Sequence, residues 1–248
     1  MRQLPLALHQ VEPPSLENFV AGRNTECVAL LTSLRAGVRE PRFIYLWGPA
    51  GAGRSHLLAA LVPPGHLVRA SAAWAESPGA EPSAAEAIAA LPGDTAGELY
   101  LIDDCDALDA PGQQALFALY NRVQASQAPV TLVTTGLQPP LFTEVREDLR
   151  SRFGWGLVFR LQLLSDEDKA LALATHASRR GVELAADIVP WLLNHQNRDI
   201  RHLIALLDAF DRHAFEQKRA LTLPLLREFM ALAQAPENIA TAEAPPPQ

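Results

Sequence analysis

The chain has few lysines, few cysteines and no long run of apolar residues. Only two of its 21 basic residues are lysines, Lys169 and Lys218, and its two cysteines are Cys27 and Cys105. Two cysteines cannot build a disulfide framework, and the seven histidines show no paired spacing typical of a metal site. The composition therefore predicts two buried thiols and gives no indication of a bound transition metal.

Net positive charge and targeting segments are also lacking. The formal net charge of −7 and the pI near 5.5 argue against a large basic surface for nucleic acid, although a local patch is compatible with an acidic total. No apolar run approaches the length of a membrane span, and the N-terminus has neither the basic start nor the apolar core of a secretory signal. We therefore expect a cytoplasmic protein with no membrane partner.

The most informative stretch is residues 48–55, with the sequence GPAGAGRS. It follows the strand-like run 43–47 and precedes the helix-forming run 56–61, which is the context of a phosphate-binding loop. Glycines allow backbone angles that a β-carbon disfavours, so successive N–H groups can turn toward an anion at the positive end of the following helix. The alternative is a glycine-rich turn that happens to precede a helix.

One residue of this loop departs from the usual pattern, because Arg54 stands where a lysine is expected. A guanidinium can bind phosphate oxygens, but it is bulkier and forked, so the loop favours nucleotide binding over hydrolysis. The hydroxyl of Ser55 is expected to bind Mg²⁺. The candidate nucleotide-binding residues of this stretch are Gly48, Gly51, Gly53, Arg54, Ser55 and His56.

Two acids end the apolar run 99–102. In a parallel sheet such a strand is buried and carries its last residues to the edge beside the phosphate loop. We therefore expect Asp103 to organise Mg²⁺ through water and Asp104 to orient or deprotonate an attacking water. The alternative is that both acids only cap the next helix. A further strand ends in Thr134 and Thr135, either of which could sense the terminal phosphate, with Thr135 as the working candidate.

The rest of the 248 residues predicts an α/β domain with a parallel sheet flanked by helices, followed by a small all-helical domain. Strands are expected at 43–47, 66–70, 98–102 and 130–135, and helices at 16–38, 56–61, 83–91 and from Pro111. After residue 160 only helices are expected, at 166–180, 186–195, 199–217 and 223–233. The expected domains are an arm (1–15), the α/β domain (16–160), the helical domain (161–233) and a disordered tail (234–248).

Two further segments carry candidate binding residues. Arg201 lies in the first turn of a helix, where a cation opposes the helix dipole, so we expect it to face an anion; the alternative is a solvated arginine. In the arm, alternate leucines share one face of an extended chain, and Pro5 lowers the entropy lost on ordering. The candidate ligands for a partner's groove are Gln3, Leu4, Leu6 and Leu8. The alternative is an edge strand or a tail folded back on its own domain.

Together these motifs resemble the AAA+ ATPases, and within them the DnaA family of bacterial replication initiators, over residues 16–233. The most specific piece is residues 151–157, SRFGWGL, which is similar to box VII of the initiators. Residues 197–203, NRDIRHL, are similar to the lid motif. This resemblance implies that Arg152 is an arginine finger for a neighbouring subunit's ATP, Arg201 the sensor 2 residue and Thr134 or Thr135 the sensor 1 residue. The alternative for Arg152 is an intrachain salt bridge.

The segment Gln3–Leu8 is similar to the sliding-clamp-binding peptide of the Hda family, the regulatory paralogues of the initiator, although Ala7 replaces a common proline. That family also has arginine in its phosphate loop and is associated with ADP. No helix-turn-helix domain follows the lid in this sequence, so we do not expect a full initiator.

The resemblance implies a regulator that holds ADP (or ATP) with Mg²⁺ and docks on the DNA-loaded clamp of DNA polymerase III. Through Arg152 it would stimulate hydrolysis of DnaA-bound ATP and so prevent over-initiation. Contact with DNA would be indirect, self-association is possible, and intrinsic ATPase activity is expected to be weak or absent. One alternative, kept open by Asp103 and Asp104, is a DnaA-like or helicase-loader-like ATPase that uses its own hydrolysis. Another is an adaptor that only tethers a partner to the clamp.

Overall fold

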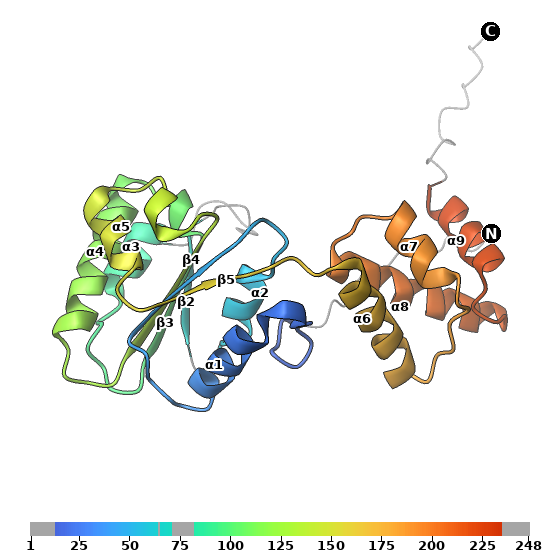
Figure 1. The fold of residues 1–248 in the computed structure, drawn as a ribbon, viewed down its shortest axis with the longest axis horizontal. Coiled ribbons are helices and arrows are strands. Elements are labelled where there is room, and N and C mark those ends of the chain that lie inside the picture. The colour runs from blue at the N-terminus through green and yellow to red at the C-terminus, as the bar shows by residue number, and fades with distance from the viewer. Residues whose placement is uncertain (1–12, 64, 71–81, 235–248) are drawn as a thin grey trace, which may run out of the picture. The chain divides into compact units, whose positions relative to one another are not determined.

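The computed structural model describes residues 13–63, 65–70 and 82–234, which fall into two compact units that divide between Ser165 and Asp166 (Figure 1). The two units are described separately. The candidate clamp-binding segment Gln3–Leu8 and the C-terminal residues 235–248 lie outside the described residues.

A five-stranded parallel sheet forms the centre of the first unit. The central strands are almost completely buried, as expected for parallel strands that are covered on both faces. Their carboxyl ends meet at one end of the sheet, because Leu46 of β1 pairs with Thr135 of β4, and Ile102 of β3 pairs with Thr134. The strand order is β2-β3-β4-β1-β5, with β1 at Phe43–Trp47, β2 at His66–Arg69, β3 at Leu99–Asp103, β4 at Thr131–Gly136 and β5 at Leu157–Arg160.

Helices cover both faces of this sheet (Figure 1). One face carries α1 (Thr25–Arg35) and α2 (Arg54–Ala59). The other face carries α3 (Ala84–Ala90), α4 (Ala110–Ala125) and α5 (Glu147–Phe153). The predicted α/β fold, with a parallel sheet flanked by helices, is therefore confirmed.

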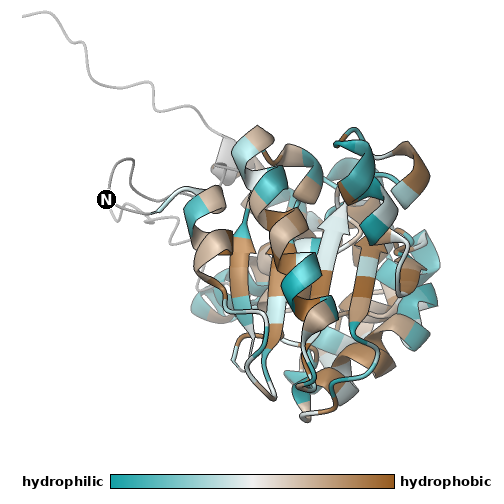
Figure 2. Cartoon of the chain, turned by 90° about the vertical axis from the view of Figure 1, so that its left-hand side faces the viewer, coloured by the Kyte–Doolittle hydropathy of each residue, from teal (hydrophilic) through white to brown (hydrophobic). Residues whose placement is uncertain are grey.

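Each face of the sheet has its own hydrophobic core, because successive strand residues point in opposite directions. In β1, Ile44 and Leu46 belong to the core that contains α1 and α2, whereas Phe43 and Tyr45 belong to the core that contains α4 and α5. Figure 2 shows strands with many apolar residues, flanked by helices that carry both hydrophilic and hydrophobic residues. The two cores hold the strands in place, and so position the loops at the ends of the strands.

Two helix starts differ from the sequence-based expectation. The helix expected from residue 16 begins only at Thr25, after a 3-10 turn at Gly22–Asn24. In the preceding segment, Ser15 and Asn18 exchange side-chain to backbone hydrogen bonds of 2.9 and 3.1 Å, which compete with helical pairing. The helix expected from Pro111 begins one residue earlier, because the carboxylate of Asp109 caps it by accepting the N–H of Gly112.

The strand β5 was not predicted. It lies at the edge of the sheet beside β1, and three of its four residues are exposed. Its apolar run, residues 157–159, is only three residues long, which is too short to identify a strand by periodicity. Gly156 immediately before it has a packing role, because a β-carbon there would overlap the carbonyl of Phe43. The glycine thus allows the chain to enter β5 against the start of β1.

The second unit is entirely helical in its described part. Its apolar faces form a single cluster, and α8 contributes residues at helical spacing to it. The carboxylate of Asp199 caps α8 by accepting the N–H of Arg201 at 2.9 Å. The helices are α6 (Asp166–Arg179), α7 (Ile188–His195), α8 (Ile200–Gln217) and α9 (Leu223–Gln234). The predicted small helical domain after the α/β domain is confirmed.

Both cysteines are buried free thiols, as expected. Burial raises the pKa of Cys27 to about 12 and that of Cys105 well above its ordinary value, so neither thiol is reactive at neutral pH. Among the described helices, none is both long enough and apolar enough to cross a lipid bilayer.

Candidate functional site

The predicted phosphate loop connects β1 to α2, and two of its three glycines have the expected backbone conformation. Gly51 and Gly53 have φ angles of 82° and 92°, in the left-handed region that residues with a β-carbon rarely adopt. Gly48 was expected to behave in the same way, but it does not have a positive φ. It is required for another reason, since a β-carbon at Gly48 would lie 2.6 Å from the carbonyl oxygen of Leu161.

The loop has donors available for an anion. Within the described part of the chain, the backbone N–H groups of Gly51, Gly53, Arg54 and Ser55 donate to no protein acceptor. They lie at the start of α2, where the positive end of the helix dipole also favours negative charge. This donor set fits the phosphates of a nucleotide.

The segment before α1 packs over this loop. The ring of Phe19 lies so close to Gly53 that a β-carbon there would be 2.5 Å from its Cε2. The ring of His56 lies 5.4 Å from that of Phe19, centroid to centroid, and its Nε2 is 3.0 Å from the carbonyl oxygen of Ser15. His56 therefore helps to hold the segment before α1 against the phosphate loop. Its direct contact with a nucleotide remains a prediction.

Asp103, Asp104 and Thr135 form a connected group at the carboxyl ends of β3 and β4. The hydroxyl of Thr135 donates to Oδ1 of the buried Asp103 at 2.7 Å and accepts the N–H of Asp104 at 2.9 Å. Thr134 points elsewhere, since its hydroxyl lies 2.9 Å from that of Tyr120 in the core. Thr135 is thus the threonine that contacts the acids, a choice that the sequence left open.

Asp104 has an unusual backbone conformation and an unexpected partner. Its φ of 53° is left-handed, which is uncommon for a residue with a β-carbon. Its Oδ1 lies 3.2 Å from Nη1 of Arg54. Arg54 is only 8% exposed. This contact is an ion pair without hydrogen-bond geometry, since Nη1 of Arg54 makes no hydrogen bond within the described residues. The arginine that replaces the usual lysine therefore already has a counter-charge in the chain.

The predicted Mg²⁺ ligands Ser55 and Asp103 belong to this same end of the sheet. In the described ranges no three His, Cys, Asp or Glu side chains gather that could hold a metal by themselves. Mg²⁺ commonly binds through one or two carboxylates together with substrate phosphates and water. The residues present fit a Mg²⁺ ion that arrives with a nucleotide, and they do not form an independent metal site.

Arg152 lies on α5 and is held by aromatic and amide groups. Its Cζ lies 3.8 Å from the ring centroid of Trp155 and 4.9 Å from that of Phe117, and its Nη2 donates to Oδ1 of Asn121 at 3.1 Å. No carboxylate of the described chain lies within salt-bridge distance of it. The alternative of an intrachain salt bridge is therefore wrong for these residues.

Arg152 lies far from the phosphate loop of its own chain. Its partner Trp155 packs edge-to-face on Phe43, the first residue of β1, with the ring centroids 5.8 Å apart. The phosphate loop follows the last residue of β1. A parallel strand rises about 3.3 Å per residue, so Phe43 and Gly48 are roughly 16 Å apart. Arg152 therefore lies near the start of β1, at the opposite end of that strand from the phosphate loop.

The helical unit contributes Arg201, which forms a local ion pair. Its Nη2 lies 2.8 Å from Oδ2 of Asp199, and its side chain is 52% exposed. The hydrogen bond from Arg201 lowers the pKa of Asp199 below its ordinary value. This pairing satisfies a cation at a helix N-terminus, and the predicted contact of Arg201 with phosphate remains a prediction.

Sequence reasoning missed Phe19, Phe117 and Asn121. Phe117 and Asn121 are four residues apart on α4, which places both on one face of the helix. An aromatic residue on the outer side of an amphipathic helix was the available signal, but its arginine partner comes from a distant part of the chain.

Comparisons with known proteins agree with this arrangement. Residues 166–230 match the family described as Hda, lid domain. The chain is 30% identical over 236 residues to an uncharacterized protein of Haemophilus influenzae, which covers 93% of this chain and 99% of that protein. The fold of this chain is similar to that of domain III of the Thermotoga maritima replication initiation protein DnaA. The TM-score is 0.63, with 17% identity over 95% of this chain and 100% of that chain. The chain is also similar to the Thermotoga maritima RuvB Holliday junction branch migration motor, with a TM-score of 0.64 and 18% identity over 90% and 72% of the two chains.

A parallel five-stranded sheet with a phosphate loop after β1, followed by a helical lid, defines an AAA+ protein. The family match and the full-length relative go further than the fold. The chain belongs to the Hda family of DnaA-related AAA+ proteins.

Proposed function

We propose that this protein inactivates the initiator DnaA by supplying Arg152 to ATP that DnaA holds. It keeps ADP at its own phosphate loop and docks on the DNA-loaded sliding clamp through Gln3–Leu8. DnaA-bound ATP is then hydrolysed to ADP, which prevents over-initiation.

The observation that carries the proposal is the placement of Arg152. It lies at the opposite end of β1 from its own phosphate loop, and it has no acidic partner among the described residues. A full positive charge directed away from its own nucleotide suits an arginine finger acting on a neighbouring subunit. Such a finger stabilises the charge that develops on the transferring phosphoryl group, and is worth about 10³ to 10⁵ in rate.

The phosphate loop supports a holding role rather than turnover. Its backbone donors suit the phosphates of ADP, with Ser55 and Asp103 as the residues that would hold Mg²⁺. The side chains of Arg54 and Asp104 are already paired with each other, so neither is free to activate water or to stabilise a transferring phosphoryl group. Bound ADP would then act as a structural ligand.

The test is hydrolysis of DnaA-bound ATP in the presence of DNA-loaded clamp, with and without the protein. The wild-type protein is expected to accelerate hydrolysis, and Arg152→Ala is expected to abolish the acceleration while ADP binding and clamp binding stay intact. The matched control is Arg150→Ala, two residues earlier on α5, which should stimulate like the wild type. Full activity of Arg152→Ala would overturn the finger assignment and leave an adaptor that only tethers its partner.

Docking on the clamp has its own test. Removal of residues 3–8 is expected to abolish binding to the clamp while the melting temperature and ADP affinity remain unchanged. Gln10→Ala, just outside the segment, serves as the control and should bind the clamp normally. Retention on the clamp after the deletion would show that the assignment of the arm is wrong.

A second candidate function is an ATPase that uses its own hydrolysis. It is favoured by the intact contact between Thr135 and Asp103, which a hydrolysing site would need. Turnover by the isolated protein separates the two candidates. Rapid ATP hydrolysis without DnaA or clamp would favour this second function, whereas a stable complex with ADP supports the regulator.

A further inference from the structure

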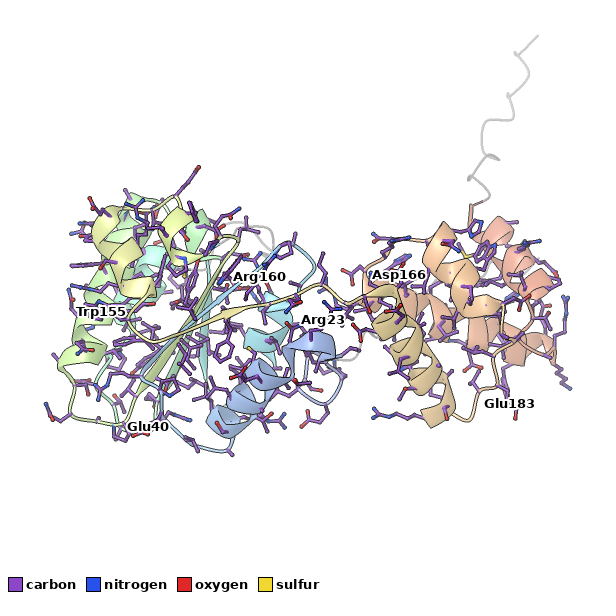
Figure 3. All side chains as sticks on the ribbon, viewed as in Figure 1. Arg23, Glu40, Trp155, Arg160, Asp166 and Glu183 are labelled. Atoms are coloured by element: carbon purple, nitrogen blue, oxygen red, sulfur yellow. The ribbon has the colours of Figure 1, made fainter. Side chains whose placement is uncertain are left out.

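The surface around Arg152 is built from two helices. Asn121 is exposed on α4, four residues after Phe117, and both face α5. Trp155 follows α5 directly, is 41% exposed, and lies on the α/β unit as labelled in Figure 3. The three side chains surround one guanidinium.

The contacts leave one edge of that guanidinium open. An arginine has five N–H donors in a fixed plane. Nη2 is held by Asn121, and Nε is enclosed without a partner. Nη1 makes no hydrogen bond within the described residues, and it is not among their fully enclosed unpaired atoms, so it keeps some exposure to solvent. The orientation of the open edge is therefore defined by its neighbours.

The neighbours also preserve the charge of Arg152. Stacking on Trp155 and Phe117 and the hydrogen bond to a neutral amide restrain the side chain without cancelling its charge. The nearby Arg146 offers a contrast, because its guanidinium is bound by both oxygens of Asp148 at 2.7 and 2.8 Å. An acid in place of Asn121 would restrain Arg152 equally well, but it would neutralise the charge.

We infer that Asn121 and Trp155 are positioning residues, which hold Arg152 ordered, charged and with Nη1 outward for the triphosphate bound by the partner subunit. This inference rests on the proposed function. Ordering the side chain in advance removes part of the entropy cost of immobilising it in the complex, which corresponds to roughly 3- to 10-fold in rate. The effect belongs to the hydrolysis step and not to formation of the complex.

The experiment measures hydrolysis of DnaA-bound ATP on clamp-loaded DNA over a range of regulator concentrations. Asn121→Ala is expected to lower the maximal rate about 3- to 10-fold, with an unchanged half-saturating concentration. The exposed Gln124, on the same helix α4 and without a side-chain hydrogen bond in the described structure, provides the control: Gln124→Ala should match the wild type.

Two matched pairs separate positioning from a merely structural role. Asn121→Asp keeps a hydrogen-bond acceptor for Arg152 but neutralises its charge, so its maximal rate should also fall below that of the wild type. Trp155→Phe keeps an aromatic face and should stay within about 2-fold of the wild type, whereas Trp155→Leu keeps only bulk and should lose about 3- to 10-fold. A structural role would make Asn121→Asp at least as active as the wild type and the two Trp155 variants equal.

The outcomes distinguish this inference from the proposed function. No stimulation by the wild type, or full stimulation by Arg152→Ala, contradicts the proposed function. If Arg152→Ala is inactive but Asn121→Ala has the wild-type rate, the positioning role is overturned and the proposed function stands. Equal losses of rate for the two Trp155 variants would also overturn the positioning role. Melting temperatures are recorded for every variant, and if Trp155→Leu unfolds, the exposed Asn121 decides the question.

Discussion

The phosphate-loop end of the sheet and the α4–α5 surface each present an arginine, but the two are held in opposite ways. Arg54 is buried and lies beside a carboxylate, whereas Arg152 lies between aromatic rings and an amide. The first charge is compensated inside the chain, and the second remains available to a partner. The neighbours of each arginine, more than the motif that contains it, therefore decide whether its charge is compensated within the chain.

Among the variants that test this comparison, Arg54→Ala is expected to have the largest effect, which is a loss of affinity for ADP. Loss of a charged donor to phosphate should weaken ADP binding about 10- to 100-fold, since hydrogen bonds to charged groups contribute about 1.5–3 kcal/mol. Arg152→Ala should leave ADP affinity unchanged. Calorimetric titration with ADP and Mg²⁺ measures both, and equal affinities for Arg54→Ala and the wild type would show that the loop binds phosphate by its backbone alone.

The two neighbouring threonines sharpen the comparison within one strand. Thr135→Val removes the hydrogen bonds to Asp103 and Asp104, and should lower the free energy of unfolding by about 1–3 kcal/mol and also weaken binding of ADP with Mg²⁺. Thr134→Val loses the contact with Tyr120 in the core and should lower stability without affecting ADP. Chemical denaturation and ADP titration of both variants provide the test; a nucleotide effect of Thr134→Val would contradict the assignment.

Asp104→Asn is expected to have a smaller and opposite effect on the affinity for ADP. In the absence of nucleotide, Asp104 competes for Arg54, so removing its charge should tighten ADP binding about 3- to 10-fold, as expected for the loss of an ion pair of about 1 kcal/mol. The same titration applies, with Asp109→Asn as a control acid on the same connection. Weaker binding by Asp104→Asn would mean that this carboxylate helps to hold the nucleotide.

The smallest effect is expected in the lid, where Arg201 also has a carboxylate partner but an exposed one. Asp199→Ala removes the cap of α8 and should lower the free energy of unfolding by about 1 kcal/mol. The hydrogen bond from Arg201 lowers the pKa of Asp199, so this stabilisation is present at neutral pH and is lost as the pH falls below the ordinary range of a carboxyl group. Denaturation of both proteins at several pH values checks the sign, because the difference between them should shrink in acid.

The elements that the sequence predicted well have local causes. β1 and β3 are largely apolar runs, β4 is rich in β-branched residues, and the capping box of Ser83 with Glu86 marks the start of α3 as expected. The phosphate loop was recognisable because its spacing lies within one short stretch. The burial of Asp103 also followed from a short run, since a buried strand carries its last residue to the edge of the sheet.

The features that escaped prediction depend on contacts between distant residues. Thr134 and Thr135 are alike in sequence, and only the pleat of β4 directs one to Asp103 and the other to Tyr120. The pairing of Arg54 with Asp104 joins residues fifty positions apart, and the support of Arg152 comes from another helix. Edge strand β5 has no buried face of its own, so periodicity could not reveal it.

The contact between His56 and Ser15 fixes the point from which the N-terminal arm leaves the α/β unit. Leu8 precedes Ser15 by seven positions, and an extended chain spans at most about 3.5 Å per residue, so at most about 25 Å of chain joins the two. Under the proposed function, a clamp bound by the arm would be tethered close to the nucleotide loop, at an effective concentration that a short linker brings to the order of millimolar. DnaA on the same DNA would then meet Arg152 without a search through bulk solution.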